Sequence, residues 1–296
     1  MIKNQTLKGV LLVALGASSY GMLATFVKMA YQEGYTTAEV SGSQFSLGLL
    51  VVILLNFLRK AKKNTDEIKI SKHQIPQLIL AGTSMGFTSI FYYLSVRYVS
   101  VSIGIVLLMQ TVWMGVLLEM WLDKKNPSPQ KIFSVVLTLI GTVLATNLLY
   151  NDLNLDWRGF FWGILAAAAF TGTMFSANKV APEIHSIQRS LFMLIGGTLI
   201  VVVFAFITQE TPFNYSIFMK WGIILSLFGT ILPPFLLNTG FPLTGIGLGS
   251  IVSALELPVS VTMAYFLLSE EISLGQWTGI LLIIVAIILM NIRLKK

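Results

Sequence analysis

The sequence predicts an all-α integral membrane protein with ten transmembrane helices in two inverted five-helix repeats. Hydrophobic residues make up 55% of the 296 residues and charged residues only 11%, whereas a soluble domain carries about 25% charged residues. Ten apolar stretches are long enough to cross roughly 30 Å of hydrocarbon. The two halves of the chain also resemble each other. A soluble protein with so few charged side chains could not cover its surface, so a bilayer is the expected solvent.

Short polar turns separate the ten apolar stretches. Asn126-Pro127-Ser128-Pro129 offers a serine N-cap with proline at the first helical position, and Asn151-Asp152 and Glu210-Thr211-Pro212 mark other turns. The first stretch is longer than the apolar core of a signal peptide, so we expect it to remain as a helix. The expected spans are 7–31, 36–58, 74–96, 100–122, 129–149, 157–178, 186–208, 217–239, 243–268 and 274–292.

The basic residues predict the orientation. Ten crossings place both termini on one side, where 16 of the 20 Lys and Arg residues fall. The other side holds Lys28, Arg97, Arg158 and Lys220. Because cytoplasmic loops are rich in Lys and Arg, we expect cytoplasmic termini in an inner (plasma) membrane protein. This distribution accounts for the net charge of +7 without a nucleic-acid partner.

An internal repeat divides the chain into residues 1–150 and 151–296. Because each half has five helices, the second half is expected to be upside down relative to the first. Inverted repeats around a midplane site are typical of secondary transporters. At an offset of 150 the aligned segments are Leu7-Lys8-Gly9 with Trp157-Arg158-Gly159 and Tyr20 with Phe170; at 146 they are Gln110 with Glu256 and Gln130 with Gln276.

The repeat also predicts packing positions. Gly9 and Gly159 each follow a basic residue at a helix start, so leucine at either position is expected to disturb assembly. Ile283 is expected to face lipid and to tolerate substitution.

Two stretches resemble the drug/metabolite transporter superfamily, EamA type. The segment from Tyr92 to Ser100, YYLSVRYVS, resembles the junction of the third and fourth helices, and Leu237–Leu243 followed by Ser253–Val259 resembles the ninth-helix region. The chain departs from the family at Leu257, which separates Glu256 from Pro258, and at Gln110-Thr111-Val112, where a proline-containing element is common. The resemblance covers the whole chain. It implies alternating-access transport of small metabolites, often export, with helices 1, 3, 4, 6, 8 and 9 around a central cavity.

Glu256 is the most informative residue of the ninth span. A charge at the centre of a membrane helix costs roughly 2.5–3.5 kcal/mol even on mild scales, so such residues usually serve function. Ser253 and Ser260 lie three residues before and four after it, which predicts one polar stripe. Pro258 lacks an amide donor and frees the carbonyl of Ala254, so the helix should kink there. We favour a carboxyl group that binds solute or carries a proton; the alternative is a protonated glutamate that packs against a neighbouring helix.

Polar or aromatic side chains in the other spans are further candidates for solute binding or coupling. Lys28 either snorkels to the headgroups or enters the cavity, and Tyr92 and Trp113 either stack on a solute or fill the core. The tandem prolines Pro233-Pro234 should disturb the eighth span. The candidates besides the Glu256 stripe are Thr25, Lys28, Tyr92, Gln110, Trp113, Asn178 and Asn238.

The leading function is therefore a secondary carrier for a small organic solute such as an amino acid, a nucleobase-like metabolite or an amphipathic drug, with protons as a possible coupling ion and export as the direction. The alternatives are a small-solute channel or a membrane protein without transport activity. We disfavour an intramembrane enzyme because all four aspartates fall in loops or at span ends. With no cysteine and two histidines near one membrane face, we expect no metal site, catalytic residue or cofactor.

Overall fold

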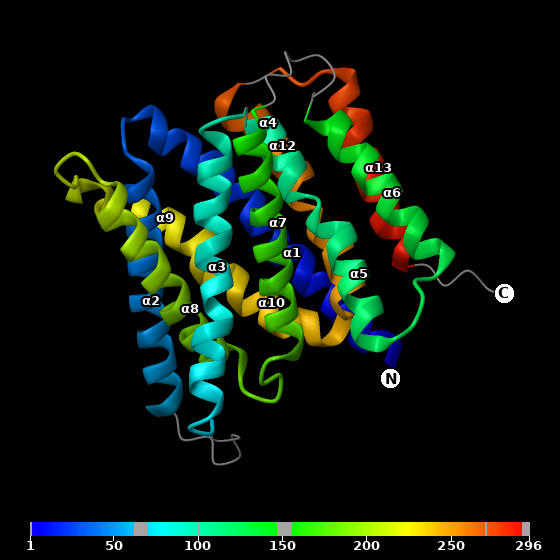
Figure 1. Ribbon diagram of the computed structural model, residues 1–296, viewed down its shortest axis with the longest axis horizontal. Coiled ribbons are helices and arrows are strands. Elements are labelled where there is room, and N and C mark those ends of the chain that lie inside the picture. Colours follow the sequence, from blue (N-terminus) through cyan, green and yellow to red (C-terminus); the bar gives the residue numbers. More distant parts are fainter. Residues whose placement is uncertain (1, 62–69, 100, 147–155, 270, 292–296) are drawn as a thin grey trace.

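Every regular element in the described residues is a helix (Figure 1). The computed structural model describes the chain except for residues 1, 62–69, 100, 147–155, 270 and 292–296. The predicted boundary at 150/151 and the Asn151-Asp152 turn lie outside the described residues. In chain order the elements are α1 (Ile2–Gln32), α2 (Thr37–Ala61), α3 (Gln74–Val96), α4 (Val101–Leu108), α5 (Thr111–Asp123), α6 (Pro129–Ala145), α7 (Trp157–Lys179), α8 (Ser186–Thr208), η2 (Tyr215–Met219), α9 (Trp221–Ser226), η3 (Leu227–Ile231), α10 (Leu232–Thr244), α11 (Ile246–Ser253), α12 (Glu256–Leu268) and α13 (Leu274–Asn291).

Eight helical segments in the described residues are long and apolar enough to cross a membrane. The predicted stretches 129–149 and 274–292 coincide with shorter apolar helices, Pro129–Ala145 and Leu274–Met290. The count of ten crossings therefore stays a prediction. Three of the eight spans combine consecutive helices: α4 with α5, α9 and η3 with α10, and α11 with α12.

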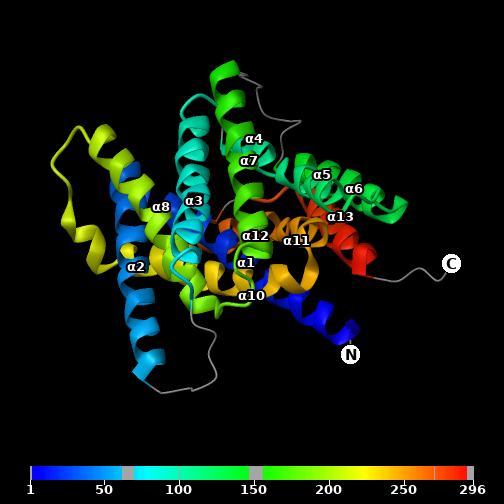
Figure 2. The same ribbon diagram turned by 60° about the horizontal axis from the view of Figure 1, so that its bottom comes forward.

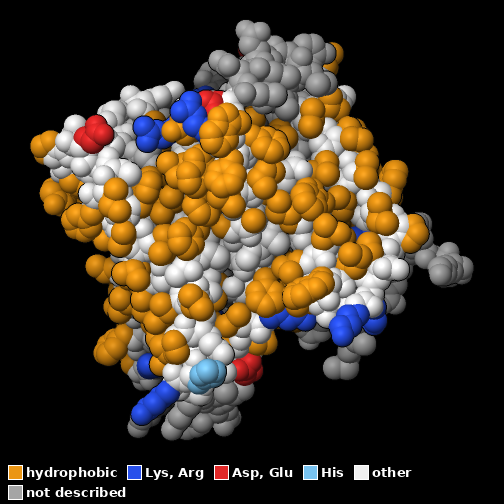
Figure 3. Space-filling view, viewed as in Figure 1, with side chains coloured by type: hydrophobic (Ala, Val, Ile, Leu, Met, Phe, Trp, Pro, Cys, Tyr) orange, Lys and Arg blue, Asp and Glu red, His pale blue; other side chains and the backbone are white. Residues whose placement is uncertain are grey.

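An apolar band crosses the face of the molecule that Figure 3 shows. Hydrophobic side chains cover the middle of the surface in Figure 3, and charged side chains gather near its upper and lower edges. Many large apolar side chains of the described residues are exposed, among them Phe57, Leu80 and Phe206. A soluble monomer rarely exposes a continuous apolar patch larger than a few hundred Å², so this band is the surface that lipid would cover.

The helix ends meet in two groups, at opposite ends of the bundle. At the Arg189 end, lowermost in Figure 1, the beginning of α8 contacts α10 and the beginning of α3 contacts the loop after α7. At the Glu39 end, uppermost in Figure 1, the beginning of α2 contacts the end of α8 and the beginning of α7 contacts the end of α3. These contacts require α2 and α3 to run in opposite directions, and likewise α7 and α8.

Helices α6 and α13 lie side by side at one edge of the molecule, away from α2 and α8 (Figures 1 and 2). The side-chain amide of Gln130, at the start of α6, donates to the Leu289 carbonyl near the end of α13. Gln276, at the start of α13, donates to the Ala145 carbonyl at the end of α6, at 3.3 Å. The two helices therefore run antiparallel. The prediction that Ile283 faces lipid is wrong, because this packing buries it completely against Gly141.

The tandem prolines disturb the eighth span as predicted. Pro233 and Pro234 cannot donate backbone hydrogen bonds, and the five residues before α10 form a π-helix, η3 (Leu227–Ile231). The Leu232 amide reaches back five residues to the Leu227 carbonyl. The helix then continues through Pro242 to Thr244, so the expected break near residues 239–243 falls instead at Gly245, which has a φ of 78°.

Candidate functional site

Two broken helices form the centre of the candidate site. Helix α4 ends at Leu108 and α5 begins at Thr111; α11 ends at Ser253 and α12 begins at Glu256. The four boundaries of the first pair recur in the second pair at an offset of 145 residues. At this offset Gln110 corresponds to Leu255 and Thr111 to Glu256, one residue away from the sequence alignment at an offset of 146.

Each break has a local cause. In the second pair, Pro258 leaves the Ala254 carbonyl without its usual donor, and the Leu257 amide takes it at 3.2 Å, as the kink prediction required. In the first pair no proline is present, but the Gln110 side-chain amide donates to the Val106 carbonyl at 2.9 Å. The Gln110 backbone amide is thereby free to bond the Leu107 carbonyl at 3.1 Å, which tightens the turn.

Glu256 occupies the first turn of α12, beside α1. A side chain at Gly21 would clash with the Glu256 backbone carbonyl, so glycine permits the close approach of the two helices. The Glu256 side chain is half-buried, and its charge interacts with the hydroxyl groups of Tyr20 and Tyr92. Among the described residues, no hydrogen bond or ion pair holds this carboxyl group. An uncommitted carboxyl group near tyrosine hydroxyls can accept a proton or a solute donor.

The equivalent position in the first half is committed to packing. The Thr111 hydroxyl is buried and lies 2.8 Å from the Thr171 hydroxyl of α7. The sequence alignment pairs Thr171 with Gly21, so the same helix crossing carries a threonine pair in one half and a glycine with a glutamate in the other. Of these two corresponding positions, Glu256 carries an ionisable side chain and Thr111 does not.

The structure brings together some of the other predicted residues near the helix breaks. Trp113 donates its indole N–H to the Gln110 side-chain oxygen at 2.8 Å, so these two act as a unit. Ser253 is buried and donates to the Gly249 carbonyl at 2.9 Å, while Ser260 is half-buried on the far side of the break. The predicted stripe through Glu256 is thus interrupted at Ala254–Leu255.

Asn178 and Asn238 lie in a second cluster, around Arg189. Asn178 donates to the Phe241 carbonyl at 2.6 Å, and Asn238 donates to the Ser190 hydroxyl at 2.9 Å. Arg189 donates to the Asn238 carbonyl at 2.7 Å, which is the carbonyl that Pro242 cannot serve. The cluster ties α7, α8 and α10 together at the Arg189 end.

The remaining predicted residues lie along α1. Thr25 is 3% exposed, and its hydroxyl has no hydrogen-bond partner among the described residues. Lys28 is exposed one turn before α1 ends, which suits snorkelling.

Two polar residues at the bundle ends escaped the sequence analysis. Arg189 was counted only as a topology signal, although it is 1% exposed. Glu39 is 3% exposed and accepts hydrogen bonds from the Thr36 amide at 2.8 Å and the Asn214 amide at 2.7 Å. The sequence Thr36-Thr37-Ala38-Glu39 carries the signal for the first of these bonds, because a threonine three residues before a glutamate is a capping box.

Glu33, just beyond α1, connects the end of this helix to the start of α9 through hydrogen bonds. Its carboxylate accepts hydrogen bonds from Lys220 at 2.5 Å and from the Trp221 indole at 2.7 Å. The hydrogen bond from Lys220, and then that from Trp221, hold the pKa of Glu33 below its ordinary value.

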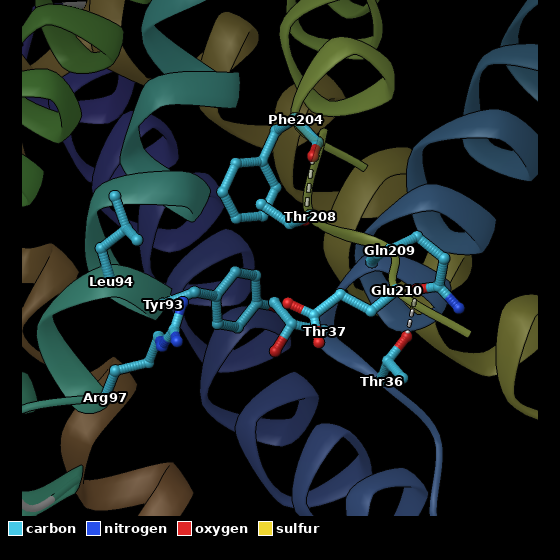
Figure 4. A pocket seen from close by; sticks show the side chains of 10 residues that line it. Thr36, Thr37, Tyr93, Leu94, Arg97, Phe204, Thr208, Gln209 and Glu210 are labelled. Carbon is cyan, nitrogen blue, oxygen red and sulfur yellow. Dashed lines mark hydrogen bonds between the residues drawn. The ribbon is translucent and has the colours of Figure 1, made fainter. Parts of the chain in front are cut away.

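A pocket of about 290 Å³ opens at the Glu39 end (Figure 4). Its lining comes from the start of α2, the end of α3 and the end of α8. No group of three or more His, Cys, Asp or Glu residues in the described part of the chain is placed to hold a metal ion.

Comparison with known proteins decides the family. The model of the EamA-like transporter family matches residues 7–147 and again residues 157–292. The chain belongs to the EamA-like transporter family. The resemblance inferred from the sequence is thereby confirmed.

Relatives of this EamA-like transporter agree with the assignment. The uncharacterized transporter sll1319 of Synechocystis sp. is 23% identical over 313 residues, which cover 98% of this chain and 95% of that protein. A crystal structure described only as that of a protein aligns with a TM-score of 0.76 over 97% of this chain and 96% of its own, at 12% identity. That likeness shows the fold alone. The chain is thus a multi-pass membrane protein of a transporter family.

Proposed function

We propose that this EamA-like transporter moves a small organic solute across the plasma (inner) membrane by alternating access of two inverted halves. Glu256 binds the solute or carries the coupling proton, and the direction is export. The single observation that carries the proposal is the Glu256 carboxyl group, half-buried at a helix break and uncommitted among the described residues.

Three observations support the inverted relation of the halves. The broken helices recur at a fixed offset of 145 residues. Gln130 and Gln276 make reciprocal hydrogen bonds in the antiparallel pair α6 and α13. The rings of Tyr20 and Phe170, which the repeat aligns, meet edge to face with centroids 6.1 Å apart. When a residue contacts its own equivalent, the pseudo-twofold axis passes between them, so this axis runs between α1 and α7 beside Glu256.

The two ends of the bundle support a pathway open toward the Glu39 end. At the Arg189 end, Asn178 and Arg189 hold α7 against the final turns of α10. At the Glu39 end, the described pocket opens beside α3. In the orientation that the basic residues predict, this arrangement is closed to the cytoplasm and open to the opposite side.

Substitution of Glu256 tests the proposal. The solute is first identified by comparing metabolites in the medium of overexpressing and deletion strains. Glu256→Gln keeps the size of the side chain but removes its titration, so in proteoliposomes the variant is expected to exchange solute for solute normally and to lose accumulation driven by a pH gradient. Loss of all exchange would assign Glu256 to solute binding. Thr262→Ala, on the same helix but outside the candidate residues, is the control for local packing.

Wild-type pH dependence in the Glu256→Gln variant would refute the coupling role. Saturation and counterflow are expected of a carrier; flux that never saturates would instead identify a channel.

A further inference from the structure

The last two turns of α5 carry two acidic side chains at the Arg189 end of the bundle. Glu119 and Asp123 are four residues apart, so they lie on one face of the helix. Asp123 lies 3.9 Å from Lys179, the last residue of α7, which places this part of α5 at the same end as Arg189. Helices α5 and α6 belong to the first EamA repeat, and α7 and α11 belong to the second. Contacts of these acidic residues can therefore join the two repeats.

Glu119 forms an ion pair with Lys131 across the turn between α5 and α6. The Lys131 ammonium group donates to the Glu119 carboxylate, and the two side chains are only 16% and 19% exposed. A partly buried pair is screened much less by salt than a pair at the surface. The strength of this pair therefore depends on the element that covers it.

The first turn of α11 covers the pair, and α5, α6 and α11 lie together in Figure 2. A Cβ atom at Gly247 would overlap the Glu119 carboxylate and would lie 3.1 Å from the Lys131 ammonium nitrogen. A Cβ atom at Gly245 would lie 2.9 Å from the same carboxylate. The two glycines thus leave room for the ion pair directly against α11. The carboxylate lies at the N-terminal end of this helix, where the helix dipole favours a negative charge.

The interface between α5 and α11 continues from the ion pair toward the helix breaks. A Cβ atom at Gly115 would lie 2.7 Å from the Ser250 side chain, and the Ser250 hydroxyl donates to the Val112 carbonyl at 3.2 Å. Ser250 is completely buried in this interface. The ion pair thus lies at the outer end of a tightly packed contact between the two repeats.

The corresponding positions of the second repeat are apolar. At the offset of 145 residues that relates the broken helices, Glu119 corresponds to Ala264 and Asp123 corresponds to Leu268. These two side chains carry no charge, so they cannot form such an ion pair. At these positions, the end of α5 has an electrostatic contact with the other repeat that the end of α12 lacks.

We propose that the Glu119–Lys131 pair, which lies on Gly245 and Gly247, is a latch that holds the α5–α11 interface closed at the Arg189 end. Under the proposed alternating access this end has to open in each cycle, so the ion pair has to separate from α11. The inference rests on the proposed function only for this role in the cycle. The contact itself can be measured without solute.

The chain contains no cysteine, so single cysteine substitutions report directly on the interface. In the purified, detergent-solubilised full-length protein, Ser250→Cys should react slowly with a maleimide, because this position is buried against α5. Glu119→Gln in this background should raise the labelling rate about threefold or more, and Lys131→Gln should raise it in the same direction, because each change breaks the ion pair. Asp156→Asn is the matched control, because it breaks an ion pair with Arg158 at the other end of the bundle.

A second reporter separates opening of the interface from general loosening of the fold. Ser95→Cys, completely buried against Gly159 and Gly163 near the Glu39 end, should stay protected when Glu119 is replaced. The inference is overturned if Glu119→Gln leaves the labelling of Ser250→Cys unchanged, if Ser95→Cys becomes reactive to the same degree, or if Asp156→Asn has an equal effect. Absence of solute transport in proteoliposomes would count against the proposed function without altering these labelling rates, so the two failures are distinguishable.

Discussion

At the scale of single residues, Arg189 combines full burial with a complete set of carbonyl partners. Its guanidinium group donates to Val180 at 3.1 Å, to Asn238 at 2.7 Å, and to Ser176 and Ala177 at 3.2 and 2.7 Å. Three of these carbonyls lie at the end of α7, where the helix dipole favours a positive charge. Within the described residues no acidic side chain lies at ion-pair distance, so the carbonyl dipoles, together with the more distant charge of Glu183, offset the lost hydration.

Removing this side chain should destabilise the fold. Arg189→Met keeps most of the volume but leaves the carbonyls without donors, and we expect a loss of about 2–5 kcal/mol in the free energy of unfolding. Lys179→Met is the matched control, because Lys179 is half-exposed and pairs with Asp123 at 3.9 Å; such pairs contribute about 0–1 kcal/mol. Thermal unfolding of each detergent-solubilised variant measures its loss of stability. Equal midpoints for the two variants would contradict the role given to Arg189.

Glu33 predicts a pH effect on stability. Its pKa is lowered in the folded protein, chiefly by the hydrogen bond from Lys220. The corresponding stability is present above the pKa of the unfolded chain and is lost as the pH falls through the lowered pKa. The unfolding midpoint of Glu33→Gln should therefore fall less than that of the wild type between about pH 5 and pH 3. Lys220→Met should flatten the profile in the same way; parallel curves for all three proteins would refute this account.

At the scale of the elements, helix contacts through glycine define the repeat. A Cβ atom at Gly9 of α1 would lie 2.6 Å from Leu243 of α10, and one at Gly159 of α7 would lie 2.6 Å from Val99 beyond α3. Gly9 of the first half thus meets the third long helix region of the second half, and Gly159 of the second half meets the end of the third helix of the first half. The Ser95 hydroxyl donates to the Gly159 carbonyl at 2.7 Å, which adds a bond that close approach makes possible.

Leucine at either glycine should separate these helices. Gly9→Leu and Gly159→Leu are each expected to lower the free energy of unfolding by about 1–3 kcal/mol, because the added atoms overlap a packed neighbour. The matched controls are Ala24→Leu in α1 and Ala168→Leu in α7, which enlarge exposed side chains on the same helices. Yield of monodisperse protein and the unfolding midpoint are the readouts. If the two control variants were destabilised as much as the glycine variants, enlarging any side chain on these helices would be harmful, and the close contact at glycine would not explain the effect.

At the scale of the whole molecule, charge placement predicts the orientation. The four basic residues assigned to one side of the membrane, Lys28, Arg97, Arg158 and Lys220, lie at or near the Glu39 end. Arg59, Lys124 and Lys179 belong to helix ends or turns at the Arg189 end. These seven basic residues thus lie in two groups at opposite ends of the bundle, the kind of distribution on which the positive-inside rule depends.

Reporter fusions test this orientation. Fusions within residues 60–72 and after Lys296 should behave as cytoplasmic, and a fusion at Glu210 should behave as extracytoplasmic. A fusion after Lys125, in the turn between α5 and α6, serves as a further cytoplasmic control. An extracytoplasmic signal from the fusion within residues 60–72 or from the fusion after Lys296 would contradict the arrangement of ten crossings and, with it, the inverted repeat.

The sequence alone determined that the protein is surrounded by lipid and that two of its helices are disturbed by proline. A composition with so few charges requires lipid, and the missing amide of Pro258 and the tandem prolines at 233–234 disturb their helices in any environment. Periodicity and turn residues set most helix limits, because they depend on neighbours within a few positions. The EamA resemblance followed from short stretches that the family model confirms.

Only the tertiary structure decided which polar groups are committed. Arg189 and Asn238 bond to partners up to 49 residues away, and Glu39 receives the Asn214 amide across 175 residues, so no local pattern could reveal these networks. The same limitation hid the burial of Ile283, since one face of an apolar helix meets lipid or protein with similar side chains. Glu256 stood out in the sequence because a carboxyl group is costly in a membrane. That it is left uncommitted, while Thr111 at the corresponding helix break is bonded to α7, depends on how α12 packs beside α1 and how α5 packs beside α7.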